Sequence, residues 1–194
     1  MELFPAECCV LVLEGEPVGA LDLSCMLAHF GCRVLGPADS PLEAAALIKR
    51  QRPSFALLDA GSRTHALEAL AESLAKIEVP FALLATGKEG SALDTMPALR
   101  RVPRIVRPFG PNVVYRVARA LHRDDLRAKI TATDRRIGEG RARLARQIRL
   151  VERLEALGVK HGTATALARE FALALRVMRA SRTIFAQQLE AYRD

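Results

Sequence analysis

The sequence lacks any apolar run long enough to cross a membrane. A membrane-spanning helix needs roughly 20 consecutive apolar residues, and no apolar run in the 194-residue chain reaches that length. The first residues, Met1 to Pro5, contain neither the basic stretch nor the long apolar core of a secretory signal. These absences predict a cytoplasmic protein.

The chain also lacks the spaced residue pairs that are typical of metal and disulfide sites. Of its four cysteines, Cys8 and Cys9 are adjacent, and Cys25 and Cys32 follow without a CxxC spacing. Metal ligands usually come in spaced pairs, and disulfide frameworks belong to short secreted chains. We expect four reduced thiols that serve mainly as small buried hydrophobic side chains.

Common catalytic motifs are missing as well. No glycine-rich phosphate loop with P-loop or Rossmann spacing occurs, and no Ser/His/Asp arrangement can be recognised. The four histidines show no ligand spacing. His122 is expected to lie on the solvated surface of a helix. The sequence therefore predicts a binding protein and not an enzyme.

The net charge of +7 is unevenly distributed along the chain. Residues 1–119 contain 13 lysines and arginines and 13 acidic residues, whereas residues 120–194 contain 16 basic residues and 9 acidic ones. Such asymmetry predicts two parts with different surfaces. On charge alone, the basic part could contact nucleic acid, an acidic protein or a membrane surface.

The first 120 residues alternate short apolar runs with helix-like stretches. Five apolar runs have the length and composition of buried strands. They lie near residues 8–13, 32–35, 55–58, 79–85 and 104–107. Helical stretches separate them, and the last helix of this part opens at Pro111. The alternation predicts an α/β fold with a five-stranded, doubly wound parallel sheet.

Polar residues lie at the carboxyl ends of four of these runs. Glu14 follows the first run and Asp59 the third. Thr86 follows the fourth run, and Arg107 ends the fifth. In a doubly wound sheet, ligands bind beyond this edge. These four residues are therefore the candidate site.

Together, these motifs resemble the receiver domain of bacterial two-component response regulators, which has a flavodoxin-like fold. Residues 11–17 (LVLEGEP) resemble its acidic turn, and residues 57–59 (LLD) resemble its phosphoacceptor strand. Residues 85–87 (ATG) resemble its hydroxyl-bearing turn, and residues 107–109 (RPF) resemble its Lys-Pro-Phe motif. Four motifs in the family's order make the resemblance specific.

The resemblance implies phosphoryl transfer to Asp59, with Thr86 and Arg107 contacting the phosphoryl oxygens. Magnesium would be held by Glu14 and Asp59. Two departures weaken the site, because the family's second acidic residue is Gly15 here and its lysine is Arg107. We therefore expect no magnesium, or a weakly bound ion, and poor phosphorylation. Alternatively, Asp59 only pairs with Arg107 and stabilises the fold.

The last third of the chain has a helical pattern and no strand-like run. Ile130, Ile137, Leu144 and Val151 recur seven residues apart. Beyond the glycine-containing residues 158–162, a second stripe alternates spacings of three and four. It consists of Ala164, Leu167, Phe171, Ala174, Met178, Ser181, Phe185, Gln188 and Tyr192. The pattern predicts an antiparallel coiled-coil hairpin of two α-helices.

Glycines and arginines interrupt the first helix of this hairpin. Gly138 and Gly140 disfavour a helix and predict a bend or a close helix contact. The arginines are Arg135, Arg136, Arg141, Arg143, Arg146, Arg149 and Arg153. A solvated helix face explains them. RNA-binding antiterminator modules of some receivers are compact three-helix units, so two long helices do not favour nucleic-acid binding.

We therefore predict a receiver-like domain at residues 6–121 and a basic helical hairpin at residues 122–194. The expected function is two-component signal transduction by contact with a sensor histidine kinase or another regulator, without a membrane partner. A working response regulator phosphorylated at Asp59 is the first alternative. An RNA-binding antiterminator-type regulator is the second.

The hairpin is also expected to form a homodimer through residues 123–194. Its seam is rich in alanine, so two helices bury a thin core, and a four-helix arrangement would bury more. Phe171 and Met178, the largest residues in the middle of the seam, are expected to contribute most to this association.

Overall fold

A computed structural model describes residues 3–61, 64–87 and 93–192 of the chain. The chain divides into two compact units, Met1–Asp125 and Leu126–Asp194. One uninterrupted helix, α5 (Pro111–Ala156), runs through this division. Within the described ranges, no helix combines the length and the apolar composition needed to cross a membrane.

The first unit contains a parallel sheet of five strands. They are β1 (Cys9–Leu13), β2 (Arg33–Ala38), β3 (Phe55–Asp59), β4 (Phe81–Ala85) and β5 (Arg104–Val106). Their order in the sheet is β2-β1-β3-β4-β5, and every neighbouring pair is parallel. The predicted α/β class and doubly wound sheet are confirmed.

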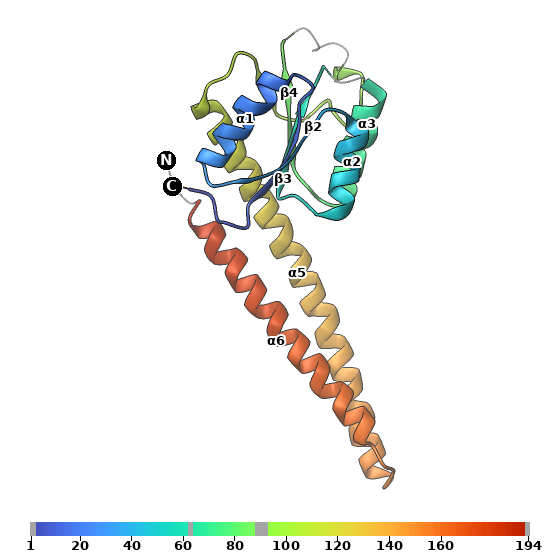
Figure 1. Cartoon of the computed structure of the whole chain (residues 1–194). Coiled ribbons are helices and arrows are strands. Elements are labelled where there is room, and N and C mark those ends of the chain that lie inside the picture. The colour runs from blue at the N-terminus through green and yellow to red at the C-terminus, as the bar shows by residue number, and fades with distance from the viewer. Residues whose placement is uncertain (1–2, 62–63, 88–92, 193–194) are drawn as a thin grey trace. The chain divides into compact units, whose positions relative to one another are not determined.

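Helices cover both faces of the sheet (Figure 1). Helix α1 (Pro17–His29) and the start of α5 pack on the face formed by alternate strand residues such as Val10 and Val12. Helices α2 (Pro41–Arg50) and α3 (Thr64–Lys76) pack on the opposite face. The three inner strands β1, β3 and β4 are largely buried on both sides, so each is an almost continuous apolar run, whereas the edge strands β2 and β5 are partly exposed and contain Arg33 and Arg104.

Local signals set the helix ends. Pro17 begins α1, where proline is favoured because the first helical N–H has no partner in the helix. The hydroxyl of Ser40 accepts the N–H of Glu43 at 3.4 Å, and Glu43 Oε2 accepts the N–H of Asp39 at 3.0 Å. This reciprocal cap fixes the start of α2.

Two expectations about single residues are wrong. His122 is 3% exposed, and its ring lies edge-on to Phe4 at a centroid distance of 5.6 Å. It is buried because this part of α5 packs on the sheet. Cys25 is exposed, whereas the other three cysteines are buried.

The buried cysteines include a pair in contact. The Sγ atoms of Cys8 and Cys32 are 3.6 Å apart. The hydrogen bond to Cys32 and burial both raise the pKa of the Cys8 thiol well above its usual range. Cys8 therefore stays protonated at neutral pH, as expected of a cysteine that serves as a small hydrophobic side chain.

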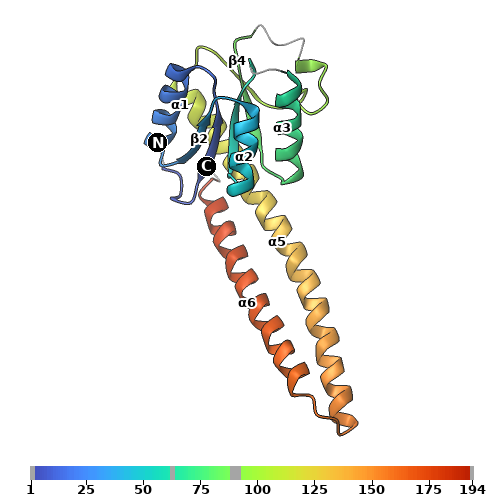
Figure 2. The same cartoon turned by 45° about the vertical axis from the view of Figure 1, so that its right-hand side comes forward.

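In the second unit, the rest of α5 pairs with α6 (Gly162–Glu190) (Figure 2). The side chain of Arg182 contacts Asp134 at 2.7 Å, and Gln147 donates to the carbonyl of Ala164 at 3.0 Å. From the first contact to the second, the residue number rises on α5 and falls on α6. The predicted antiparallel hairpin is confirmed.

The hairpin turn lies in the glycine-containing segment where the sequence predicts it. Gly158 has a positive φ of 64° and donates its N–H to the carbonyl of Glu155. The N–H of Val159 returns to the carbonyl of Leu154. These bonds end α5 by satisfying carbonyls that have no partner within the helix.

The seam between the helices differs from the predicted stripe at two residues. Leu167 and Ala174 are exposed, whereas Ala168 is half-buried and Leu175 is 4% exposed. The observed seam also has spacings of three and four, with two consecutive spacings of three from Leu175 through Met178 to Ser181. Burying the leucine at 175 in place of the alanine at 174 removes more apolar area from water.

The glycine pair in α5 offers a matched stability test. A Cβ at Gly140 would lie 2.8 Å from Leu175 Cδ2, whereas a Cβ at Gly138 would meet nothing within 4 Å. The predicted close helix contact is therefore present at Gly140.

We expect Gly138→Ala to raise the free energy of unfolding by about 0.5–1 kcal/mol and Gly140→Ala to give a smaller gain or a loss. Urea unfolding of the full chain, followed by circular dichroism, measures both; equal gains would contradict the close contact.

Candidate functional site

The four candidate residues all lie at the carboxyl edge of the sheet. Glu14 directly follows β1, and Asp59 is the last residue of β3. Thr86 directly follows β4, and Arg107 directly follows β5. Between β1 and β3 the strand order reverses, which in open α/β sheets marks the ligand-binding crevice.

Glu14 and Arg107 form an ion pair across this edge. Arg107 Nη2 donates to Glu14 Oε2. The Glu14 side chain is only 3% exposed. Its second oxygen, Oε1, accepts the backbone N–H of Glu16 at 3.2 Å. Both carboxylate oxygens of Glu14 therefore have partners from the chain itself.

The same guanidinium also lies near Asp59. Arg107 Nη2 is 3.8 Å from Asp59 Oδ1, a distance for charge attraction and longer than a hydrogen bond. The Asp59 side chain is 19% exposed and so remains accessible to solvent. The positive charge of Arg107 between two carboxylates offsets their mutual repulsion.

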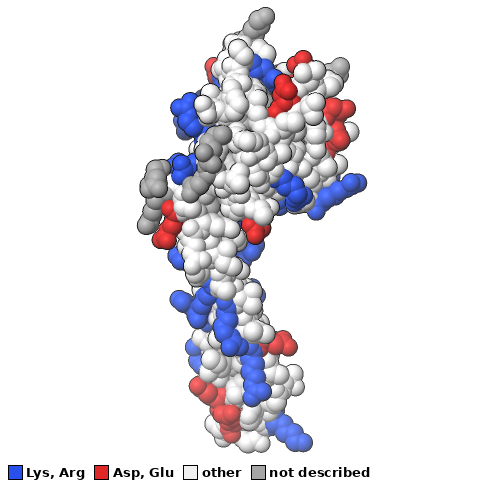
Figure 3. Space-filling view, turned by 60° about the vertical axis from the view of Figure 1, so that its left-hand side comes forward, with Lys and Arg blue, Asp and Glu red and all other residues white. Residues whose placement is uncertain are grey.

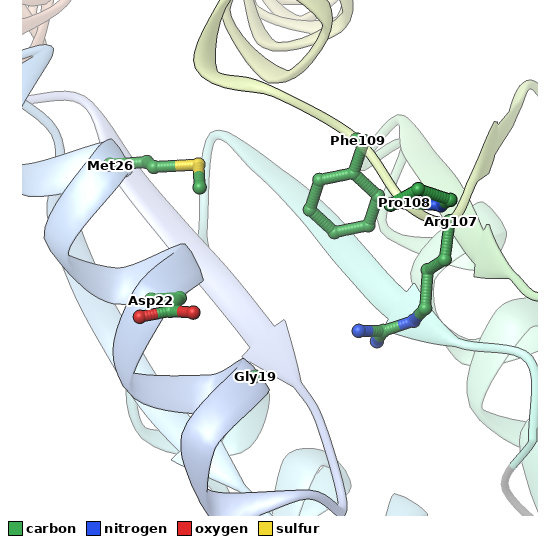
Figure 4. A pocket seen from close by; sticks show the side chains of 6 residues that line it. All are labelled: Gly19, Asp22, Met26, Arg107, Pro108 and Phe109. Atoms are coloured by element: carbon green, nitrogen blue, oxygen red, sulfur yellow. The ribbon is translucent and has the colours of Figure 1, made fainter.

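Neighbouring residues hold Arg107 in this position. Its Cζ lies 5.4 Å from the centre of the Phe109 ring, within the range of a cation–π contact. A Cβ at Gly19 would lie 3.3 Å from Arg107 Nη1 and 3.4 Å from Glu14 Cδ. The glycine in α1 thus leaves room for the ion pair, and in Figure 4 Arg107 extends from the end of β5 toward α1.

Two other positions complete the description of the site. Thr86 is exposed at the end of β4. Gly15 is also exposed, and a Cβ there would meet only the carbonyl oxygen of Asp39, at 3.9 Å. The backbone at position 15 therefore leaves space for a side chain that the sequence does not supply.

The residues present do not fit a magnesium site. Magnesium requires oxygen ligands in a nearly ideal octahedron, but both oxygens of Glu14 are engaged and Gly15 has no side chain to offer. In the part of the chain that the structure describes, no three His, Cys, Asp or Glu residues gather where they could hold a metal ion. The guanidinium of Arg107 is the cation that the structure places beside these carboxylates.

A pocket of about 440 Å³ adjoins the site. It is lined by Gly19, Asp22, Met26, Arg107, Pro108 and Phe109. Figure 4 shows α1 residues on one side of this pocket and the residues that follow β5 on the other. Elsewhere on α1, Val18 and Leu21 are 66% and 64% exposed and lie one helical turn apart. The apolar patch formed by these two residues is a candidate contact surface.

Comparison with solved structures identifies the fold of this unit. Chemotaxis protein CheY4 of Vibrio cholerae matches with a TM-score of 0.52 and 18% identity, over 59% of this chain and 98% of that one. A two-component response regulator from Clostridium difficile matches with a TM-score of 0.52 and 15% identity, over 59% and 95%. The first unit has the receiver fold.

The receiver unit also resembles SdrG of Pseudomonas melonis Fr1, solved in a BeF3-activated conformation. Here the TM-score is 0.52 and the identity 26%, over 61% of this chain and 99% of that one. The resemblance to response regulators, predicted from four motifs, is thus confirmed. No protein-family model and no curated protein matches the sequence.

The sequence predicted that the four candidate residues lie at one edge of the sheet, where the structure has them, but not the contact that joins two of them. It suggested a pair between Asp59 and Arg107, which are 3.8 Å apart, and not the hydrogen-bonded pair between Glu14 and Arg107. It also gave no role to Gly19, which leaves room for that pair. In the sequence, the only indication of room for this pair was the small residue in the first turn of α1.

Proposed function

We propose that this chain is a two-component signalling protein whose receiver unit acts by binding other proteins, with phosphorylation of Asp59 weak or lost. The observation that carries this proposal is the ion pair between Arg107 and Glu14. It engages the acidic residue after β1 that would otherwise help to bind a divalent cation.

The physical argument concerns charge at Asp59. A phosphoryl group approaching a carboxylate needs a cation that offsets the negative charge on both. Among the described residues, Arg107 supplies a positive charge 3.8 Å from Asp59, and it is already hydrogen-bonded to Glu14. Moving Arg107 toward a phosphoryl group would leave the buried Glu14 carboxylate without its ion-pair partner, which is costly.

The same pair gives the receiver unit a constant surface. It joins the ends of β1 and β5 and lies against Gly19 of α1, the helix that carries the apolar patch of Val18 and Leu21. A surface that does not depend on a phosphoryl group suits a protein whose partner binds it continuously. We propose a sensor histidine kinase or another signalling protein as that partner.

A pull-down with the full chain as bait tests this proposal. Asp59→Asn should recover the same partner as the unmodified chain, because binding does not require phosphorylation. Leu21→Asp should weaken binding of that partner at least tenfold, since it places a charge in the apolar patch. Leu42→Asp on α2, where the leucine is 83% exposed, is the matched control and should bind normally.

A working response regulator is the second candidate, and one observation favours it. Asp59 stands at the end of β3 with a partly exposed side chain, as a phosphoacceptor must. A partner recovered only from the unmodified chain after treatment with acetyl phosphate, and never from Asp59→Asn, would support this candidate and contradict constant binding.

A further inference from the structure

Helix α6 carries a second apolar stripe on the side that faces away from the seam. We call it the outer stripe. It consists of Leu173, Val177, Ala180 and Ile184, with spacings of four, three and four. Leu173, Val177 and Ile184 are 55%, 59% and 52% exposed. Such spacing is typical of a helix that packs on another helix, and no described residue covers this stripe.

Arginines border the outer stripe. Arg169 and Arg176 lie one helical turn from Leu173, before and after it, and both are exposed. Arg179 is also exposed, whereas Arg182 is bound to Asp134 within the hairpin. In Figure 3, Lys and Arg side chains gather over the hairpin on the face in view. The outer stripe is therefore apolar at its centre and positive along the side that carries Arg169 and Arg176, with Glu170 as the acidic residue next to it.

We propose that the outer stripe binds an acidic amphipathic helix of another protein. Apolar residues of that helix would cover Leu173, Val177 and Ile184, and its glutamates or aspartates would pair with Arg169 and Arg176. The stripe extends over 12 residues, from Leu173 to Ile184, or about 16 Å of helix, which is three turns of a partner helix. Docking of a helix on an apolar helix face is a common mode of recognition.

A second copy of this chain fits the outer stripe less well. In residues 169–184, α6 has four arginines and one glutamate. Two copies placed face to face would bring these like charges together. The exposed apolar area of the stripe is also small beside the roughly 800 Å² per partner of a stable interface. Binding here needs attraction between opposite charges.

Nucleic acid and membranes also fit less well. Proteins that bind single-stranded nucleic acid stack bases on aromatic rings, and helices that lie on membranes bury a broad apolar face rich in Trp, Phe and Leu. The outer stripe contains one leucine, one valine, one isoleucine and one alanine. Aliphatic side chains of this kind have no partner on a phosphate backbone.

A labelled peptide tests the proposal on the full chain. The probe is a synthetic peptide of about three heptads with leucine at positions a and d and glutamate at e and g, which keeps it from pairing with itself. Fluorescence anisotropy at about 150 mM salt, near the physiological ionic strength, should show micromolar binding. The same peptide with lysine in place of glutamate should bind at least tenfold more weakly.

Two pairs of variants locate the binding. Leu173→Ser with Val177→Ser should weaken binding of the acidic peptide at least tenfold. Leu157→Ser with Val159→Ser removes two exposed apolar residues at the hairpin turn, 68% and 49% exposed, and should leave binding unchanged. Circular dichroism shows whether each variant keeps its helices.

A charge-reversed variant keeps the test decisive if the serine variants lose helix. Arg169→Glu with Arg176→Glu should bind the lysine peptide and reject the acidic one. Equal binding of both peptides to the unmodified chain, or no binding of the acidic peptide, would overturn the proposal. Three further results would overturn it: a dimer in sedimentation, binding of phosphatidylserine vesicles, or binding of an RNA hairpin. Each counts against the proposal if the unmodified chain shows it and the variant with Leu173→Ser and Val177→Ser does not.

Discussion

Acetyl phosphate with magnesium is expected to leave Asp59 of the unmodified protein almost unlabelled. Gly15→Asp combined with Arg107→Lys should raise the phosphorylated fraction at least tenfold. The first change adds a carboxylate at the edge of the site, and the second removes the guanidinium that engages Glu14. Intact-mass spectrometry measures the fraction, and Asp59→Asn on the same background shows whether the label is on Asp59.

The structure indicates that both changes can be accommodated. A Cβ at Gly15 would meet only Asp39 O, at 3.9 Å, so a carboxylate side chain has room. Lysine at 107 carries a single ammonium group and lacks the planar fork of arginine. Because the cation and the added carboxylate act on the same developing charge, the two changes should be non-additive.

Gly110→Asp is the matched control for the added carboxylate. Gly110 is exposed in the loop before α5, and a Cβ there would meet nothing within 4 Å. This change should not increase the labelling of Asp59. Rapid and stoichiometric phosphorylation of the unmodified protein would contradict the proposed loss of phosphoacceptor function and favour a working response regulator.

The fold of the first unit could be predicted because burial on both faces makes the inner strands β1, β3 and β4 almost continuous apolar runs, each followed by a helical stretch. Residues at the ends of β1, β3, β4 and β5 then share one edge by topology alone. The contact between Glu14 and Arg107 could not be predicted in this way. These residues are 93 positions apart, and β3 and β4 lie between their strands. Only the reach of the arginine side chain joins them.

The second unit was predictable in outline and not in detail. Apolar residues spaced three and four apart predict two packed helices, but this spacing does not decide which of two neighbouring columns of residues on α6 is buried. The choice depends on which column is bulkier, as the buried Leu175 shows. The predicted boundary near residue 121 has no helix-breaking signal beside it, because residues 112–157 contain no proline and α5 is continuous there.

Replacing Arg52 by alanine should be the most destabilising exchange of a charged residue in the receiver unit. Its Nη1 contacts Asp125 Oδ1 at 2.8 Å, and the Asp125 side chain is fully buried. Arg52 also donates to the carbonyls of Pro53, Ile77 and Glu78, at 3.3, 3.3 and 2.9 Å. It thereby ties the segments before β3 and β4 to α5.

Loss of Arg52 would remove an ion-pair partner from the buried carboxylate of Asp125. Removing one member of a buried pair costs roughly 3–5 kcal/mol. Because the Arg52 side chain is 36% exposed and water can replace part of its contacts, we expect a loss of about 2–4 kcal/mol in the free energy of unfolding. Urea unfolding, followed by circular dichroism, measures it.

Arg116→Ala on the exposed side of α5 is the matched control and should change the free energy of unfolding by less than about 0.5 kcal/mol. Asp125→Asn should relieve much of the cost of losing Arg52, because a neutral amide is cheaper to bury than a carboxylate that has lost an ion-pair partner. The double variant should therefore lose less free energy of unfolding than the sum of the losses in the two single variants. A loss below about 0.5 kcal/mol for Arg52→Ala, or strict additivity with Asp125→Asn, would show that this pair does not stabilise the receiver unit.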